Sequence, residues 1–267
     1  MNRLRIGFTV VMLSLTLATV APAHAGRSCE ARQPDAVTVE RSMDLALQTA
    51  RELEAGGAQV VVLARAGQDL GRYGLRWSHL GFAYRDASQT PAPWRVVHKL
   101  NACGSERGDL YRQGLGEFFM DDLHRFEAGY VIPTPEVQSR LLTLLSDNRR
   151  VAALHTAAYS MVAYPWSQTY QQSNQWAIET LALAMEPGVL SRERAQAWLR
   201  YKGYEPTVLR LGPLVRLGAR VSSANIAFDD HPNDKRFSDR IETVTVDSVF
   251  AWLTRAGLSG PVRTVVR

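Results

Sequence analysis

The sequence predicts an α+β fold in which helices pack on a small antiparallel sheet, formed by one domain spanning residues 26–267. Three observations lead to this prediction. Strand-like and helix-like segments follow one another without an internal repeat or a clear linker. Two short segments, Trp77–Tyr84 and Trp94–His98, are rich in β-branched and aromatic residues and have turn residues between them. The composition, 46% hydrophobic and 9% aromatic, allows a buried core and excludes a disordered protein.

The first 25 residues have the pattern of a signal peptide. Arg3 and Arg5 form a basic leader, Ile6–Val20 is apolar, and Ala23-His24-Ala25 has the small-x-small pattern that signal peptidase cleaves. The apolar run is shorter than the ~20 residues of a membrane-spanning helix. We therefore expect cleavage after Ala25, export to the periplasm, and a mature protein without a membrane span.

Charge and glycine patterns exclude two classes of ligand. The net charge is +5, and Arg3 and Arg5 supply two of these charges, so the mature protein has only a small basic excess. Such an excess over scattered charges does not indicate nucleic-acid binding. The glycines Gly67, Gly71 and Gly74 lack the following Lys-Ser or Lys-Thr pair of a phosphate-binding loop. We predict no nucleic-acid partner and no cofactor.

The chain has two cysteines, Cys29 and Cys103. In an oxidising compartment, an even pair predicts a disulfide, which would stabilise the fold by ~4 kcal/mol. The alternative is that Cys103, five residues after His98, is a free nucleophile. It follows a turn-like sequence and does not begin a helix, where a thiolate is best stabilised.

The N-terminal half contains helices and strands of ordinary length. Helical spacing predicts a helix over Val39–Glu54, and the apolar run Gln59–Ala66 predicts a strand buried on both faces. After the two histidine segments, we expect a helix over Leu110–Phe126 and a short strand at Tyr130–Ile132.

The C-terminal half is predicted to be mainly helical. Thr134 is expected to cap a helix that starts at Pro135, and further helices are predicted over Asn174–Met185 and Ser191–Lys202. A last helix is expected from Val249 to Ala256. The C-terminal part also contains two further segments, over residues 208–217 and 242–246.

Two histidines and a later helix start form the most informative pattern. His79-Leu80-Gly81-Phe82 and Val96-Val97-His98 each place a histidine on a short predicted strand, and Asn174 opens a helix further along. This order resembles the circularly permuted papain-like hydrolases of the NlpC type and the lecithin-retinol-acyltransferase-like group. The resemblance covers roughly residues 59–185. It implies a papain-like core, with His79 and His98 in the catalytic site and the nucleophile position at Asn174-Gln175.

The chain as a whole also resembles an exported proteobacterial family of unknown function (DUF2145-like). The residues that carry this second resemblance are Ser173-Asn174-Gln175-Trp176 and Phe228-Asp229-Asp230-His231-Pro232.

The nucleophile of the permuted papain-like group is missing. Gln175 stands where that group has a cysteine, and an amide has no nucleophilic atom that a histidine could activate. Ser173 is the nearest replacement, because a serine can attack when a histidine accepts its proton. The alternative role of Ser173 is that of a helix N-cap.

An acidic loop near the C-terminus is the only candidate for a metal site. Asp229, Asp230, His231 and Asp234 could supply ligands, but the loop lacks the glycine and the glutamate of a calcium-binding loop. We expect a solvated turn before Pro232 and no metal.

Three functional hypotheses follow. The first is a catalytically impaired papain-like protein that binds a cell-wall peptide or an acyl chain, with Tyr164, Trp166 and Tyr170 lining the groove. The second is an active hydrolase or acyltransferase that uses Ser173 or Cys103 with His79. The third is a structural or interaction protein whose histidines do no chemistry. The sequence leaves the oligomeric state open.

Overall fold

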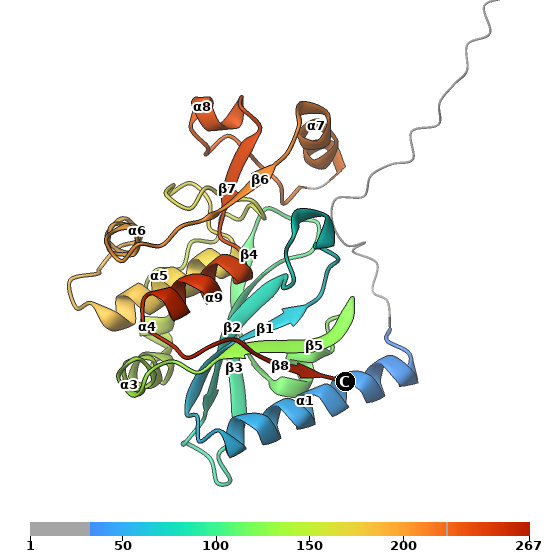
Figure 1. Ribbon diagram of the computed structural model, residues 1–267, viewed down its shortest axis with the longest axis vertical. Coiled ribbons are helices and arrows are strands. Elements are labelled where there is room, and N and C mark those ends of the chain that lie inside the picture. Colours follow the sequence, from blue (N-terminus) through green and yellow to red (C-terminus); the bar gives the residue numbers. More distant parts are fainter. Residues whose placement is uncertain (1–32, 223) are drawn as a thin grey trace, which may run out of the picture.

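A computed structural model describes residues 33–222 and 224–267 (Figure 1). The segment 1–25 and Cys29 lie outside the described residues. Cleavage after Ala25 and the Cys29–Cys103 disulfide therefore stay predictions.

A six-stranded sheet in the order β4-β3-β2-β1-β5-β8 forms the centre of the protein, and all neighbouring strands are antiparallel. Its strands are β1 (Val60–Ala66), β2 (His79–Arg85), β3 (Trp94–Asn101), β4 (Gly108–Gly114), β5 (Arg125–Val131) and β8 (Arg263–Val266). The α+β class with an antiparallel sheet is confirmed. The two histidine strands are neighbours, with Phe82 opposite Val97.

One face of the sheet is covered by α1 (Ala36–Ala55) and α2 (Leu115–Phe119), as Figure 1 shows for α1. The Asp35 carboxylate caps α1 by accepting a hydrogen bond from the Thr38 N–H at 2.7 Å. Side chains that alternate along β1 point to this face, so Val61 and Leu63 pack against the apolar side of α1.

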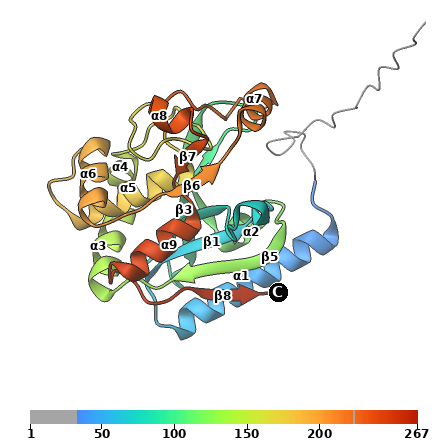
Figure 2. The ribbon, with the colours of Figure 1, turned by 45° about the horizontal axis from the view of Figure 1, so that its top comes forward.

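The opposite face carries the larger core and most of the helices. These are α3 (Pro135–Leu145), α4 (Asn148–Ala152), α5 (Ser173–Met185), α6 (Arg192–Tyr201) and α9 (Val246–Arg255). Thr134 caps α3 and Ser191 caps α6, so both predicted helix starts are confirmed. Figure 2 shows α5 between the sheet and α6. Every residue of α5 from Ser173 to Ala182 is buried.

A small two-stranded unit lies at one end of the sheet. It consists of β6 (Thr207–Arg210) and β7 (Arg240–Thr243), with α7 (Pro213–Ser222) and α8 (Asn233–Arg236). In both Figure 1 and Figure 2, α7 and α8 lie at the end of the molecule away from α1. A separate apolar cluster that includes Leu209, Ile226, Phe228 and Ile241 fills this unit.

The predicted helix over Leu110–Phe126 is wrong. Residues 108–114 form β4, only Leu115–Phe119 are helical, and β5 begins at Arg125. The apolar residues Leu115, Phe118 and Phe119 do follow helical spacing, which explains the prediction. The first half of the segment is a strand because β3 needs a partner at the sheet edge, and all seven β4 residues pair with it.

Two further elements near the C-terminus differ from the expectation. The last helix begins at Val246 with a Thr245 and Ser248 capping box, three residues earlier than expected. It is followed by β8, a strand that the sequence analysis did not predict. Within the described residues, no helix is long and apolar enough to cross a bilayer.

Candidate functional site

The two histidines are in direct contact, as their positions on neighbouring strands require. The Nε2 atom of His79 lies 2.8 Å from Nδ1 of His98, and the ring centroids are 5.1 Å apart. Both rings also lie against Phe118 of α2. The pair therefore belongs to the layer between the sheet and α2.

A chain of hydrogen bonds determines which ring nitrogens carry protons. The Gln113 amide N–H donates to Glu117 at 3.2 Å, so its carbonyl oxygen faces His98 Nε2 at 2.7 Å and must accept from it. His98 Nδ1 is then an acceptor, and His79 Nε2 must be the donor. This leaves Nδ1 of His79 as the unprotonated nitrogen.

Burial and a neighbouring cation keep both histidines neutral. The pKa of His79 is held well below its ordinary value, first by burial and then by the positive charge of Arg65. The pKa of His98 is lowered to about 3 by the same two causes. A general base works best when its pKa lies near the working pH. Neither imidazole is suited to accept a proton at neutral pH.

The surroundings of Gly81 explain why the first histidine motif contains a glycine. A Cβ atom at this position would lie 2.8 Å from the Cβ of His98 and 2.9 Å from the Val97 carbonyl oxygen. The close approach of the two backbones therefore needs a residue without a side chain. The His-Leu-Gly-Phe pattern is accounted for by packing around the histidine pair.

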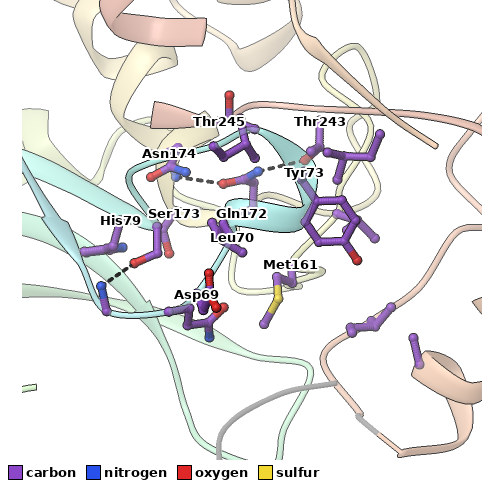
Figure 3. A pocket seen from close by; sticks show the side chains of 18 of the residues that line it. Asp69, Leu70, Tyr73, His79, Met161, Gln172, Ser173, Asn174, Thr243 and Thr245 are labelled. Atoms are coloured by element: carbon purple, nitrogen blue, oxygen red, sulfur yellow. Dashed lines mark hydrogen bonds between the residues drawn. The ribbon is translucent and has the colours of Figure 1, made fainter. Parts of the chain in front are cut away.

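A cavity with a volume of about 760 Å³ lies beside the histidine strand. Its walls come from the β1–β2 connection, the start of α5, the β6–β7 unit and α7 (Figure 3). Most of the wall is apolar, and the residues that form it include Leu70, Tyr73, Leu75, Trp77, Met161, Val162, Leu209, Leu211, Ile226 and Phe228. This volume is in the range of small-molecule sites.

One end of the cavity is polar. Figure 3 shows Gln172, Ser173 and Asn174 together at the start of α5, near Thr243 and Thr245. The Gln172 side chain is occupied, because it accepts from Asn174 N at 3.0 Å and donates to Thr243 Oγ1 at 2.8 Å. The Ser173 hydroxyl lies beside the Tyr159 phenol, whose pKa is raised by burial and lowered to a smaller extent by a hydrogen bond to Ser173.

The start of α5 reaches the histidine strand, but through Asn174. Its side-chain oxygen accepts from the Leu80 N–H at 3.2 Å. Leu80 packs in the same core as α5, whereas His79, its neighbour in the strand, directs its ring to Phe118 on the other face. His79 contributes to the cavity wall, yet no hydrogen bond joins it to Ser173. His79 and Ser173 therefore both line the cavity, but the His79 ring is hydrogen-bonded to His98 and not to Ser173.

Gln175 does not occupy the predicted nucleophile position. Its amide N–H group donates to the carbonyl oxygens of Pro165 at 3.2 Å and Tyr164 at 3.4 Å, and the residue is not part of the cavity wall. The two-residue step from Ser173 to Gln175 turns the side chain by about 200° around the helix axis, which explains why Gln175 points away from the cavity. Ser173 and Asn174 lie at the cavity, and Gln175 does not.

The three aromatic residues expected to bind a ligand do not line this cavity. Trp166 packs edge-on against Tyr204, with ring centroids 6.1 Å apart. Tyr164 lies against the His231 ring at 5.1 Å, and the Tyr170 hydroxyl is 3.3 Å from both carboxylate oxygens of Asp229. These side chains hold the loop before α5 in place.

The acidic loop is more buried than the solvated turn that was expected. Asp230 and His231 are buried side chains 3.0 Å apart, and Asp230 accepts from the Tyr164 N–H at 2.7 Å. His231 Nε2 lies 2.9 Å from the Glu242 carbonyl oxygen. Among the described residues, no group of three or more His, Cys, Asp or Glu side chains is arranged to hold a metal. Cys103, the other alternative nucleophile, lies in the turn between β3 and β4 and is not part of the cavity wall.

The sequence analysis missed a buried ionic cluster centred on Glu179 of α5. Arg192 donates to its carboxylate at 2.8 and 3.2 Å, and Gln171 and Gln196 donate at 2.6 and 2.8 Å. Arg192 also donates to the carbonyl oxygens of residues 167, 168 and 170. A glutamate in the middle of an otherwise apolar helix was the available signal, because such a residue must be paired when buried.

Lys99 extends this polar cluster toward the cavity. Its Nζ donates to the carbonyl oxygens of Thr156 and Gln171 at 2.6 and 2.7 Å and to the Gln171 side chain at 3.1 Å. Burial, followed by the charge of Arg192, lowers the pKa of Lys99 to about 7. All three protons of the ammonium group have acceptors, so Lys99 joins two loops and is not available as a base.

Fold and site together define an α+β protein with an apolar cavity at the start of a buried helix. The chain belongs to the family described as "Uncharacterized protein conserved in bacteria (DUF2145)", whose match covers residues 52–253. This match includes both histidine strands, α5 and all residues that line the cavity. No curated protein and no solved structure matches the chain.

Proposed function

We propose that the protein is an exported ligand-binding protein without hydrolytic activity, whose cavity holds an amphiphile with one apolar chain. The scaffold is that of the permuted papain-like hydrolases, with the site altered so that it binds and does not react. The observation that carries this proposal is the cavity of about 760 Å³, whose wall is mostly apolar, with polar side chains at the start of α5 and in the connections β1–β2 and α2–β5.

The absence of a matched base and nucleophile supports the non-catalytic part of the proposal. His79 is neutral, hydrogen-bonded to His98, and turned toward α2. Ser173 has Tyr159 as its neighbour, and burial raises the pKa of that phenol, so it stays protonated at neutral pH and cannot take up the serine proton. A serine without an oriented base attacks an acyl group very slowly.

The cavity wall favours an acyl chain over a cell-wall peptide. A peptide would bring many amide groups against an apolar wall, where each unpaired group costs about 1–3 kcal/mol. A fatty acyl chain has no such groups. Its carboxylate or ester oxygen would lie at the N-terminus of α5, where the helix dipole and the Ser173 hydroxyl favour an oxygen acceptor.

Displacement of a fluorescent fatty acid from the purified protein tests the proposal. We expect saturable binding by the wild type and a loss of at least tenfold in affinity in Gly218→Trp. Gly218 lies on α7 in the cavity wall, and no atom is within 4 Å of an added Cβ. Gly212→Trp is the matched control, because Gly212 has the same open surroundings but is not part of the wall. No saturable binding by the wild type, or equal losses in the two variants, would contradict the proposal.

An esterase assay tests the alternative that the protein is a hydrolase. We expect no turnover of short-chain and long-chain p-nitrophenyl esters by the wild type. Turnover that disappears in Ser173→Ala would replace the proposed function with a serine hydrolase or acyltransferase. Export is tested separately, by N-terminal sequencing of the native protein, which should begin at Gly26.

A further inference from the structure

A basic surface adjoins one side of the cavity. We call this surface the basic rim and define it as residues 210–220 and 233–240, which include most of α7, all of α8 and the adjoining ends of β6 and β7. The rim contains six basic and two acidic residues. Leu211, Leu214 and Val215 of the rim also form part of the cavity wall, so the rim and the cavity are continuous.

Large apolar side chains of the rim are exposed. Leu214 is 84% exposed, Leu217 is 62% exposed, and Phe237 is 72% exposed. Arg216 links the two helices that carry them, because it donates to the Arg236 carbonyl oxygen and, at 3.0 Å, to Asp239. Figure 2 shows α7 and α8 at the same end of the molecule.

Several cations of the rim have no acidic partner in the part of the chain that the structure describes. Arg210 and Arg240 are directly opposite each other on β6 and β7, and both are exposed. Two like charges at opposite positions destabilise a strand pair. The exposed Arg220 on α7 also lacks an acidic partner there, whereas the rim carboxylate of Asp239 is already paired with Arg216. These three arginines therefore favour the binding of an anion from outside the protein.

We propose that the basic rim docks on the surface of an anionic lipid bilayer, from which the ligand enters the cavity. The inference rests on the proposed function, since it names the source of the acyl ligand. Leucine and phenylalanine side chains next to arginines are typical of helices that lie at a membrane interface. Lipid phosphates would neutralise Arg210, Arg220 and Arg240, and Leu214, at the cavity mouth, would lie at the acyl boundary.

Flotation with lipid vesicles tests the docking. The whole mature protein is mixed with vesicles of phosphatidylglycerol and phosphatidylcholine or of phosphatidylcholine alone. We expect binding to the anionic vesicles only, weakening at least fivefold between 50 and 300 mM salt, because exposed charges are screened. Equal binding to both vesicle types, or binding to neither, would overturn the inference.

Two matched variants locate the docking surface. Leu217→Asp should reduce vesicle binding at least fivefold, whereas Leu190→Asp should not, although Leu190 is 75% exposed on a distant loop. Leu217 is not part of the cavity wall, so Leu217→Asp should still bind the fluorescent fatty acid in the absence of vesicles. Equal vesicle binding by the two variants would overturn the inference.

The two assays separate failure of the docking from failure of the proposed function. A protein that binds the free fatty acid and ignores anionic vesicles keeps its proposed function but lacks the docking surface. A protein that binds vesicles through Leu217 without binding the fatty acid keeps the docking surface and loses the proposed function. A dimer in sedimentation experiments that dissociates in Leu217→Asp would assign the rim to a second copy of the chain and overturn the lipid assignment.

Discussion

Ser173 and Gln175 are only two positions apart, yet their side chains end in different surroundings. Ser173 lies at the cavity, next to Tyr159, and Gln175 is bonded to the carbonyl oxygens before α5. The sequence could indicate that one of the two residues meets the site. It could not indicate which, because helix phase depends on where the first turn begins, and Gln172 is the N-cap.

Cysteine substitutions at these two positions give a direct test. A thiol in Ser173→Cys should be alkylated at mildly acidic pH, since a helix N-terminus lowers a thiol pKa and the position is open to the cavity. A thiol in Gln175→Cys should react at least tenfold more slowly because it is buried. Peptide mass spectrometry measures the modification at each site.

The His79→Ala background is the control for this experiment. Because the His79 ring is turned toward Phe118 and hydrogen-bonded to His98, its removal should leave the reactivity of Ser173→Cys unchanged. A tenfold drop in reactivity without His79 would show that the imidazole reaches Ser173, and a Ser–His site would have to be reconsidered.

At the scale of elements, α5 is the helix on which the site depends. It is buried on nearly all sides, and its Glu179 holds Arg192, which in turn holds the loop before α5. The Glu179–Arg192 pair in the middle of α5 therefore helps to keep Ser173 at the cavity.

Breaking the Glu179–Arg192 pair should destabilise the protein strongly. Arg192→Met leaves the Glu179 carboxylate buried without its cation, at a cost of about 3–5 kcal/mol. The double variant with Glu179→Met should be destabilised by less than the sum of the two single variants, since no uncompensated charge remains. Chemical denaturation of the three variants measures these differences in the free energy of unfolding.

An exposed ion pair is the matched control for this measurement. Arg140 lies 3.0 Å from Glu136 one helical turn away, and both side chains are largely exposed. Arg140→Met should cost about 1 kcal/mol or less. Equal losses for Arg192→Met and Arg140→Met would show that the buried cluster is not what holds α5 and the loop together.

The sequence predicted helices whose start is marked by a capping residue. It missed strands that form only because a neighbouring strand pairs with them. Thr134-Pro135 and Ser191 marked two helix starts correctly because a cap is a local interaction. The strand at residues 108–114 was predicted as helix, since its strand character comes from pairing with β3. The last strand, β8, is short and depends on β5 in the same way.

For the whole molecule, the antiparallel arrangement of the histidine strands could be predicted, but the cavity could not. The strands are joined by a short connection, which favours antiparallel pairing. The cavity wall combines the β1–β2 connection, the start of α5 and the β6–β7 unit, which are far apart along the chain. The His79 ring also points away from the core that Leu80 shares with α5, and only the alternation along β2 reveals this.

The buried histidine pair should make global stability depend on pH in the acidic range. In the folded protein, the pKa of His98 is lowered to about 3, and that of His79 is also well below its ordinary value of 6.5. Below about pH 6.5, the unfolded chain therefore binds more protons than the folded chain, and the free energy of unfolding falls as the pH is lowered. Above pH 6.5 these two residues have no such effect, because both states are neutral there.

Each histidine should steepen the loss by up to about 1.4 kcal/mol per pH unit below about pH 6. Denaturant unfolding from pH 7.5 to pH 4.5 measures the slope for the wild type and for the double variant His79→Gln, His98→Gln, whose amides are uncharged throughout this range. The variant should have the flatter slope, since only carboxylates and the remaining histidines still titrate. Equal slopes would mean that the imidazoles take up protons in the folded state. The pair would then be accessible to solvent, and the argument that His79 is too weak a base for catalysis would fail with it.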